Sequence, residues 1–183
     1  MASRVLFVVY DNGSYDNEFP MGVGALAAVL KKQGHEITLW CQDIHHYPDS
    51  SLTAYLDKNK FDVVILSLIA GYYQYQKMKN LSKAINNSKN RPFYVMGGYG
   101  PTPEPEFFLK KSGCDVVGMG EGEITISKLM GAIENKTPLR NVPGIAWLEN
   151  GKLQQTPRAP LVHSLDSLEW YPYELFDMGH YRM

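Results

Sequence analysis

The run FDVVILSL, residues 61–68, is almost continuously apolar and rich in β-branched side chains. Strands that helices cover on both faces have this composition, whereas a strand with one solvated face alternates apolar and polar residues. The run RVLFVVY, residues 4–10, has the same character. We therefore expect two strands buried inside a parallel sheet, with residues 61–68 as the central one.

Extended and helical patterns alternate through the rest of residues 4–134. Further strands are predicted at 35–40, 91–96 and 115–118, and helices at 21–33, 52–58, 73–86, 104–111 and 124–134. We expect Gly34 to end the first helix and Asp49-Ser50-Ser51 to cap the start of the second. The five-fold alternation predicts the α/β class: a doubly wound, five-stranded parallel sheet, Rossmann-like or flavodoxin-like, in strand order 2-1-3-4-5.

The character of the sequence changes after residue 136. Residues 144–148 and 152–155 predict a β-hairpin, because the Asn150-Gly151 pair between them suits a tight turn. The remainder is rich in proline and aromatic residues and contains no segment able to form a core of its own. We therefore divide the chain into a domain at 1–136 and a hairpin with an extended linker, which packs on another surface, at 137–183.

Composition excludes several functional classes. The 183 residues carry a net charge of −1 and no block of Lys and Arg, which argues against a nucleic-acid surface. No window approaches the roughly 18 apolar residues of a membrane span. Cys41 and Cys114 are expected to be buried and reduced, and no C-x-x-C pair is present for a zinc or iron–sulfur site. We expect a cytoplasmic protein without a metal site of its own.

Two glycine-rich stretches carry the functional signal. MGGYGPT, residues 96–102, and GMGEGE, residues 118–123, each follow a predicted strand and lead into a predicted helix. Glycines at such places let a bulky ligand approach the backbone and its N–H donors. The two stretches together predict one ligand lying across the carboxyl edge of the sheet. Ser67 ends the central strand at this edge, where its hydroxyl either contacts the ligand or satisfies adjacent backbone.

The two acids in the second stretch do not predict a catalytic pair. Side chains two residues apart at the start of a helix do not face one another. We expect Glu123 to cap the helix and favour its dipole, and Glu121 to contact ligand or solvent. No catalytic residue is predicted in this chain.

Two further motifs have an alternative interpretation. Gly22-x-Gly24-x-x-Ala27, with Asp43 further on, satisfies a dinucleotide fingerprint, but it starts too far beyond the first strand to make the required turn. Two small residues that let the first helix pack close to the sheet explain it better, and a nucleotide-binding oxidoreductase remains the runner-up. Asp43-Ile44-His45 matches half of the D-x-H-x-x-G motif of corrinoid carriers, but Pro48 replaces the glycine. We expect His45 and His46 to be histidines of a surface loop.

Taken together, the ordered motifs resemble the N-terminal cobalamin-binding domain of cobalamin-dependent radical S-adenosylmethionine (SAM) enzymes. The resemblance runs over nearly the whole chain. It rests on Pro20-Met21-Gly22, Gly34-His35-Glu36, Ser67, residues 97–102, Asp115-Val116-Val117, residues 120–123, Pro143-Gly144-Ile145-Ala146, Leu165-Asp166-Ser167-Leu168 and residues 173–177. This sequence departs from the family pattern at two points. It lacks the C-x-x-x-C-x-x-C motif of the family's catalytic half, and it has Tyr99-Gly100 where the family usually has His.

The resemblance implies that cobalamin is the ligand, with its nucleotide tail inserted past Ser67 and Gly97-Gly98. The corrin ring would then rest on the loops after strands one and three. The implied contacts are Asp11, Asn12, Ser67, Leu68, Ala70, Gly71, Gly97, Gly98, Tyr99, Gly100, Thr102, Gly120, Glu121, Gly122 and Glu123. The loop after strand one, residues 11–20, contains no histidine, which favours a base-off corrinoid without a histidine ligand.

The resemblance also implies a larger parent enzyme, of which this chain is a truncated part. That enzyme would be a methyltransferase whose radical SAM catalytic domain holds a [4Fe–4S] cluster and SAM and is the partner of this domain. The chain itself would hold the cofactor without being catalytic. The alternatives are a stand-alone corrinoid carrier and a flavodoxin-like nucleotide-binding domain.

Overall fold

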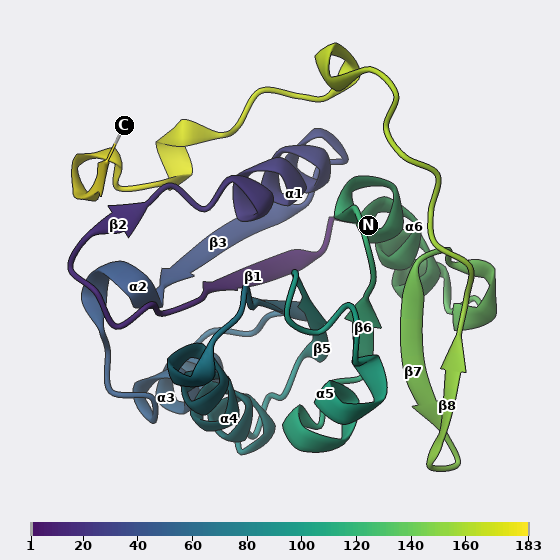
Figure 1. Cartoon of the computed structure of the whole chain (residues 1–183), viewed down its shortest axis with the longest axis horizontal. Coiled ribbons are helices and arrows are strands. Elements are labelled where there is room, and N and C mark those ends of the chain that lie inside the picture. The colour runs from purple at the N-terminus through teal and green to yellow at the C-terminus, as the bar shows by residue number, and fades with distance from the viewer. Residues whose placement is uncertain (1, 183) are drawn as a thin grey trace.

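A single sheet of seven strands organises the computed structural model, which describes residues 2–182 (Figure 1). Its order is β3-β1-β4-β5-β6-β7-β8. The strands are β1 (Arg4–Val9), β3 (Glu36–Cys41), β4 (Val63–Ser67), β5 (Phe93–Gly97), β6 (Val116–Gly118), β7 (Ile145–Glu149) and β8 (Lys152–Gln155). The first five are parallel, with β4 in the middle of the five, so the predicted 2-1-3-4-5 order is confirmed.

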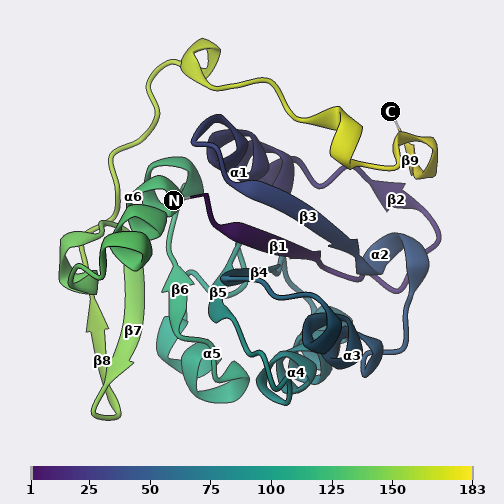
Figure 2. The same cartoon turned by 180° about the vertical axis from the view of Figure 1, so that it is seen from behind.

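Helices cover both faces of the sheet, as Figures 1 and 2 show. On one face lie α1 (Met21–Lys32) and α6 (Gly122–Asn135). On the other lie α3 (Ser51–Lys58), α4 (Tyr72–Asn86) and α5 (Pro105–Ser112). Along β1, Phe7 is buried in the core on the α1 side, whereas Leu6 and Val8 are buried in the core on the α4 side. Burial on both faces explains why β1 and β4 are apolar without alternation.

The predicted hairpin forms, but it extends the sheet instead of standing apart from it. β7 pairs antiparallel with β6, placing Ala146 opposite Val117 and Ile145 opposite Gly118. Asn150 (φ 52°) and Gly151 (φ 75°) both have positive φ at the turn, as a tight hairpin turn of this kind requires. The sheet is therefore mixed and seven-stranded, because Ile145 and Ala146 are apolar and complete the cores on its two faces.

The predicted end of α1 is confirmed, and α3 starts within one residue of its predicted start, but the expected side-chain cap of α3 is wrong. Gly34 follows α1 with φ 88°, a conformation that glycine adopts without strain. At α3, Ser50 occupies the cap position but makes no side-chain capping bond. The Asp49 carboxylate instead accepts hydrogen bonds from Lys77 (3.1 Å) and Asn80 (2.9 Å), so α4 uses the oxygen atoms that were expected to cap α3.

Several short elements have no counterpart in the sequence patterns. They are α2 (Gln42–His45), η1 (Leu139–Asn141), β2 (Asn17–Glu18) and β9 (Tyr181–Arg182). We call residues 157–182 the C-terminal strap; it includes the 3-10 turns η2 (Leu165–Ser167), η3 (Tyr173–Leu175) and η4 (Met178–His180) and ends in β9. The strap runs over α1 and pairs with β2 (Figure 1). The expected linker therefore packs on the parallel-sheet domain itself.

Two further observations concern the cysteines and the hydrophobicity of the helices. Cys41 and Cys114 are free and buried, as expected, and burial raises the pKa of the Cys114 thiol to about 12. No helix within residues 2–182 is long and apolar enough to cross a membrane.

A test of the core concerns Tyr94, whose side chain is fully buried beneath α4. Its hydroxyl makes a hydrogen bond of 2.8 Å with Ser82 Oγ. We expect Ser82→Ala to lower the free energy of unfolding by about 1–3 kcal/mol, because the phenol loses its buried partner. Urea unfolding measures this change. The control is Ser127→Ala, which removes a hydroxyl that accepts an exposed hydrogen bond from Gln33. Its free energy of unfolding should stay within about 0.5 kcal/mol of the parent. Equal losses in both variants would contradict the expectation.

Candidate functional site

Four loops meet at the carboxyl edge of the parallel strands. We call them the first loop (residues 11–20, after β1), the second loop (68–71, after β4), the third loop (98–104, after β5) and the fourth loop (119–121, after β6). β1 and β4 are neighbours, and the chain leaves them toward opposite faces, through α1 and α4. Such a switch point is where open α/β sheets bind ligands.

Three glycines at this edge face open space. A Cβ built on Gly97 or Gly71 would meet no atom within 4 Å, and one on Gly120 would meet only Arg158 Cδ at 3.8 Å. Gly97 ends β5 directly opposite Ser67 in the ladder, and Ser67 is half-buried there. The backbone is therefore open to a bulky group beside Ser67, as the glycine-rich stretch predicted.

Other glycines of the two stretches are explained by packing within the chain. Gly98 has φ 108°, and a Cβ there would lie 3.0 Å from the Leu68 carbonyl carbon and closer still to its oxygen. A Cβ on Gly100 would lie 2.9 Å from the Ile69 oxygen, so both glycines let the second and third loops cross. A Cβ on Gly122 would meet a Leu26 methyl at 2.8 Å, where α6 packs on α1. Ligand contact at these three positions stays a prediction.

Asp11 lies inside the protein, although it was predicted to contact a ligand. Its carboxylate is fully buried, 3.3 Å from His46 Nδ1 and 3.4 Å from Lys77 Nζ, and it accepts a hydrogen bond from the Gly13 amide. Burial lowers the pKa of Lys77, but Asp49 and Asp11 outweigh this effect and raise it, so the ammonium stays charged. The Asp11 oxygens are therefore occupied by the chain's own groups, and Asp11 orients the first loop.

The two neighbouring histidines differ from one another. His45 is exposed, as predicted for a surface loop. His46, however, follows α2 in a left-handed conformation (φ 44°) and faces Asp11, while its buried Nε2 has no hydrogen-bond partner among the described residues. The prediction was wrong for His46, because the α2 turn directs its ring inward. Nothing in the sequence pattern signals this turn.

Gln74 was missed by the sequence reasoning, and it joins two of the loops. It is buried at the start of α4, where its Oε1 accepts a hydrogen bond from the Ile69 amide (2.9 Å). Its Nε2 donates to Asn12 Oδ1, and the backbone N–H of Asn12 donates to Asp43 Oδ1 (2.7 Å). Gln74 thus ties the second loop to the first across the switch point. A glutamine among tyrosines at the start of a helix gives no signal of this role.

The remaining predicted residues lie around the same edge. Thr102 Oγ1 donates to the Gly98 carbonyl (2.9 Å) and accepts from the Gly120 amide (3.5 Å), which links the third and fourth loops. Glu121 accepts a hydrogen bond from the Val162 amide of the strap (3.1 Å). Glu123 lies in the first turn of α6, whose N-cap residue is Glu121 and makes no side-chain capping bond. The cap expected at Glu123 is therefore wrong. Leu68 is buried and Ala70 is exposed.

Three exposed tyrosines belong to the loops of this edge or to the helix that follows one of them. Tyr15 of the first loop is 90% exposed, Tyr72 at the start of α4 is 79% exposed, and Tyr99 of the third loop is 84% exposed. Exposed apolar groups gathered at one edge are typical of a surface that a large ligand or another domain covers. The edge therefore combines open backbone at three glycines with three exposed tyrosines.

Gly24 of the dinucleotide fingerprint is explained by packing within the chain. A Cβ on Gly24 would lie 3.1 Å from the Phe19 ring and 3.3 Å from the Tyr171 ring, so this glycine makes room for aromatic packing. Asp43 is buried and accepts the Asn12 hydrogen bond, and burial raises its pKa. The small residues were expected to let α1 pack close to the sheet, but Gly24 faces the rings of Phe19 and Tyr171, and a Cβ on Gly22 would meet no atom within 4 Å. The expectation was therefore wrong about the surface that Gly24 packs against.

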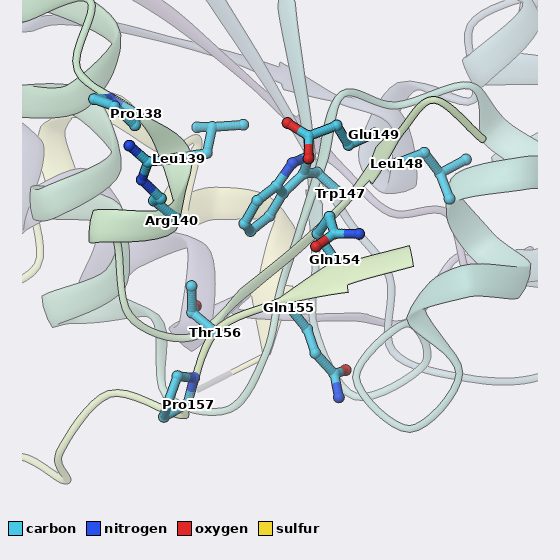
Figure 3. A pocket seen from close by; sticks show the side chains of 10 residues that line it. All are labelled: Pro138, Leu139, Arg140, Trp147, Leu148, Glu149, Gln154, Gln155, Thr156 and Pro157. Carbon is cyan, nitrogen blue, oxygen red and sulfur yellow. The ribbon is translucent and has the colours of Figure 1, made fainter. Parts of the chain in front are cut away.

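One concavity lies outside this edge. A concavity of about 680 Å³ lies on the hairpin beside η1 (Figure 3). It is lined by Pro138, Leu139, Arg140, Trp147, Leu148, Glu149, Gln154, Gln155, Thr156 and Pro157. None of these residues belongs to the four loops. Within residues 2–182, no group of three or more His, Cys, Asp or Glu side chains is placed to hold a metal ion.

Comparison with known proteins identifies related sequences. The family model for the B12 binding domain matches residues 12–130. An uncharacterised methyltransferase of Pyrococcus horikoshii is 28% identical over 165 residues, covering 89% of this chain and 35% of the relative. The anaerobic magnesium-protoporphyrin IX monomethyl ester cyclase of Synechocystis is 25% identical, covering 88% of this chain and 32% of the relative. Cytidylyl-2-hydroxyethylphosphonate methyltransferase of Streptomyces wedmorensis is 27% identical, covering 80% and 31%. The chain thus spans about a third of the length of these relatives.

Solved structures share the fold. The radical SAM methyltransferase TsrM from Kitasatospora setae, solved with cobalamin and a [4Fe–4S] cluster bound, superposes with a TM-score of 0.77 at 18% identity, covering 93% of this chain and 31% of that one. The cobalamin-dependent SAM radical enzyme OxsB, solved with aqua-cobalamin and SAM bound, superposes with a TM-score of 0.72 at 18% identity, covering 87% and 23%. At this identity the likeness establishes the fold.

The division among the glycines predicts effects of different size for the same substitution at adjacent positions. Gly98→Ala should lower the free energy of unfolding by about 2 kcal/mol or more, because the new methyl group meets the Leu68 carbonyl in a strained backbone conformation. Gly97→Ala should change it by less than about 1 kcal/mol, because its Cβ meets open space. Urea unfolding of both variants measures the difference, and equal stabilities would contradict the loop crossing described above.

Proposed function

Because the chain belongs to the B12-binding domain family, we propose that it binds cobalamin at the carboxyl edge of its sheet. The observation that carries this proposal is the open backbone at Gly97, Gly71 and Gly120 around the switch point. A large cofactor with a nucleotide tail needs a floor without side chains, and these positions supply one. When bound, cobalamin would supply methyl-transfer chemistry.

The residues of the edge fit different parts of such a cofactor. Ser67 and Gly97 would receive the nucleotide tail at the ends of β4 and β5, where backbone amides suit its phosphate. The exposed rings of Tyr15, Tyr72 and Tyr99 would lie around the corrin, because flat apolar groups cover one another well. Asp11, Gln74 and Thr102 would act through the loops that they tie together, as positioning residues.

We further propose that the corrinoid is held base-off, without a histidine of this chain beneath the metal. The first loop contains no histidine, and the Nδ1 of His46 faces the buried Asp11 carboxylate. The tail would occupy the sheet edge, which keeps its benzimidazole away from the lower face of the corrin.

The larger enzyme is also a proposal. The relatives are about three times as long as this chain, and two of the three are methyltransferases by name. We propose that this domain serves a radical SAM methyltransferase whose catalytic domain, with its [4Fe–4S] cluster and SAM, is the domain's partner. The 183 residues contain two cysteines, fewer than the three thiolates that bind such a cluster, so their own role would be to hold and shield cobalamin.

Binding is tested by titrating hydroxocobalamin into the protein and following its visible absorption spectrum. We expect saturable binding by the parent and a fall in affinity of at least about tenfold in Gly97→Leu, because the side chain fills the open floor. Gly131→Leu is the matched control, since a Cβ there also meets no atom within 4 Å but points from the α6 surface. Equal affinity in the parent and Gly97→Leu would disprove the assignment of the site.

The ligation proposal is tested by electron paramagnetic resonance of the protein loaded with cob(II)alamin. We expect a spectrum without nitrogen superhyperfine splitting from an axial ligand. Splitting that disappears in His46→Ala or His45→Ala would instead identify that histidine as the ligand. Splitting that persists in all five single His→Ala variants would identify the cofactor's own benzimidazole.

A further inference from the structure

The C-terminal strap and the first loop meet in a small ladder of their own. β2 pairs parallel with β9, placing Asn17 opposite Tyr181 and Glu18 opposite Arg182. This ladder is separate from the main sheet, and an isolated two-stranded ladder is at best marginally stable. Other contacts must therefore hold the two segments together.

Those contacts are aromatic and centre on Phe19 of the first loop. Its ring centroid lies 4.8 Å from that of Phe176, 5.5 Å from those of Tyr171 and Tyr173, and 5.7 Å from that of Tyr181. All four partners belong to the strap, and Phe176 and Tyr181 are buried. Offset and edge-on ring pairs at these distances add about 0.5–1.5 kcal/mol each beyond the burial of their area. The absence of a Cβ at Gly24 leaves the space that this cluster fills.

Polar contacts add less. Lys31 and Lys32 of α1 pair with Glu174 and Glu169 of the strap, but all four side chains are substantially exposed and such pairs contribute little. Inside, the Tyr181 hydroxyl lies 3.8 Å from the Cys41 thiol at the end of β3. The aromatic cluster is therefore the main attachment of the strap to the first loop.

The other end of the strap borders the opposite side of the same edge. The Val162 amide donates to Glu121 at the start of α6. Arg158 Cδ is the atom that a Cβ built on Gly120 would meet, at 3.8 Å. The strap thus contacts the fourth loop near its beginning and the first loop near its end. These two loops flank the proposed cofactor site.

We propose that the strap is a positioning element for the cofactor: its cluster around Phe19 holds the first loop in the binding position. This inference rests on the proposed cobalamin site. It makes cofactor affinity depend on residues 171–182, which contribute no predicted contact of their own. By linkage, any event that draws this part of the strap away from Phe19 weakens cobalamin binding, and cobalamin binding in turn holds the strap in place.

Two measurements test the proposal: amide hydrogen exchange, with and without the cofactor, and hydroxocobalamin titration. The variants are Tyr181→Ala and Phe176→Ala, which remove rings from the cluster. Tyr181→Phe keeps its ring and should bind as the parent does. The matched control is Trp170→Ala, because Trp170 belongs to the strap but is 89% exposed.

In both alanine variants we expect faster exchange at residues 11–18 with unchanged exchange in β1, β4 and β5. The dissociation constant for hydroxocobalamin should rise about tenfold, which corresponds to a first loop in its binding position about a tenth of the time. Parent-like exchange at residues 11–18, or faster exchange throughout the sheet, would overturn the proposal. Failure of the parent itself to bind hydroxocobalamin would reject the proposed function, while the exchange measurement would still decide whether the strap holds the loop.

Discussion

The parallel register of β1, β4 and β5 is the constraint on which the rest of the structure depends. It brings the carboxyl ends of the strands to one edge, and so gathers loops that are up to a hundred residues apart in sequence. It also requires each connection to return over a face of the sheet, which buries β1 and β4 on both sides. The same register therefore accounts for the apolar runs, the two cores and the position of the candidate site.

The loops at this edge are held by buried polar groups. The buried Asp11 carboxylate contacts Lys77 and His46, while Gln74 hydrogen-bonds both the first and the second loop. A buried charge is costly when it loses its partner, so such groups specify one arrangement more than they add stability. A site that must accept a large rigid cofactor benefits from loops that are ordered before binding, because less conformational freedom is lost on association.

The glycines at this edge serve two different purposes that the sequence pattern does not distinguish. Gly98 and Gly100 are required where the second and third loops cross, and Gly122 where α6 meets α1. Gly97, Gly71 and Gly120 face open space and leave the floor of the site free. The proposed cobalamin site rests on the second kind, which a substitution can fill without disturbing the loop crossing.

The sequence by itself determined the α/β class, the order of the five parallel strands, the hairpin turn at Asn150-Gly151 and the edge at which the glycines gather. Each of these depends on local patterns: apolar periodicity, turn residues and the strict alternation of strand and helix. Only the tertiary structure decided that the hairpin joins the sheet, that Asp11 and His46 turn inward, that Gln74 bridges two loops, and that the strap returns to Phe19. These features arise from contacts between residues far apart in the chain, whose polar or aromatic character has no periodicity, so no local pattern carries information about their partners.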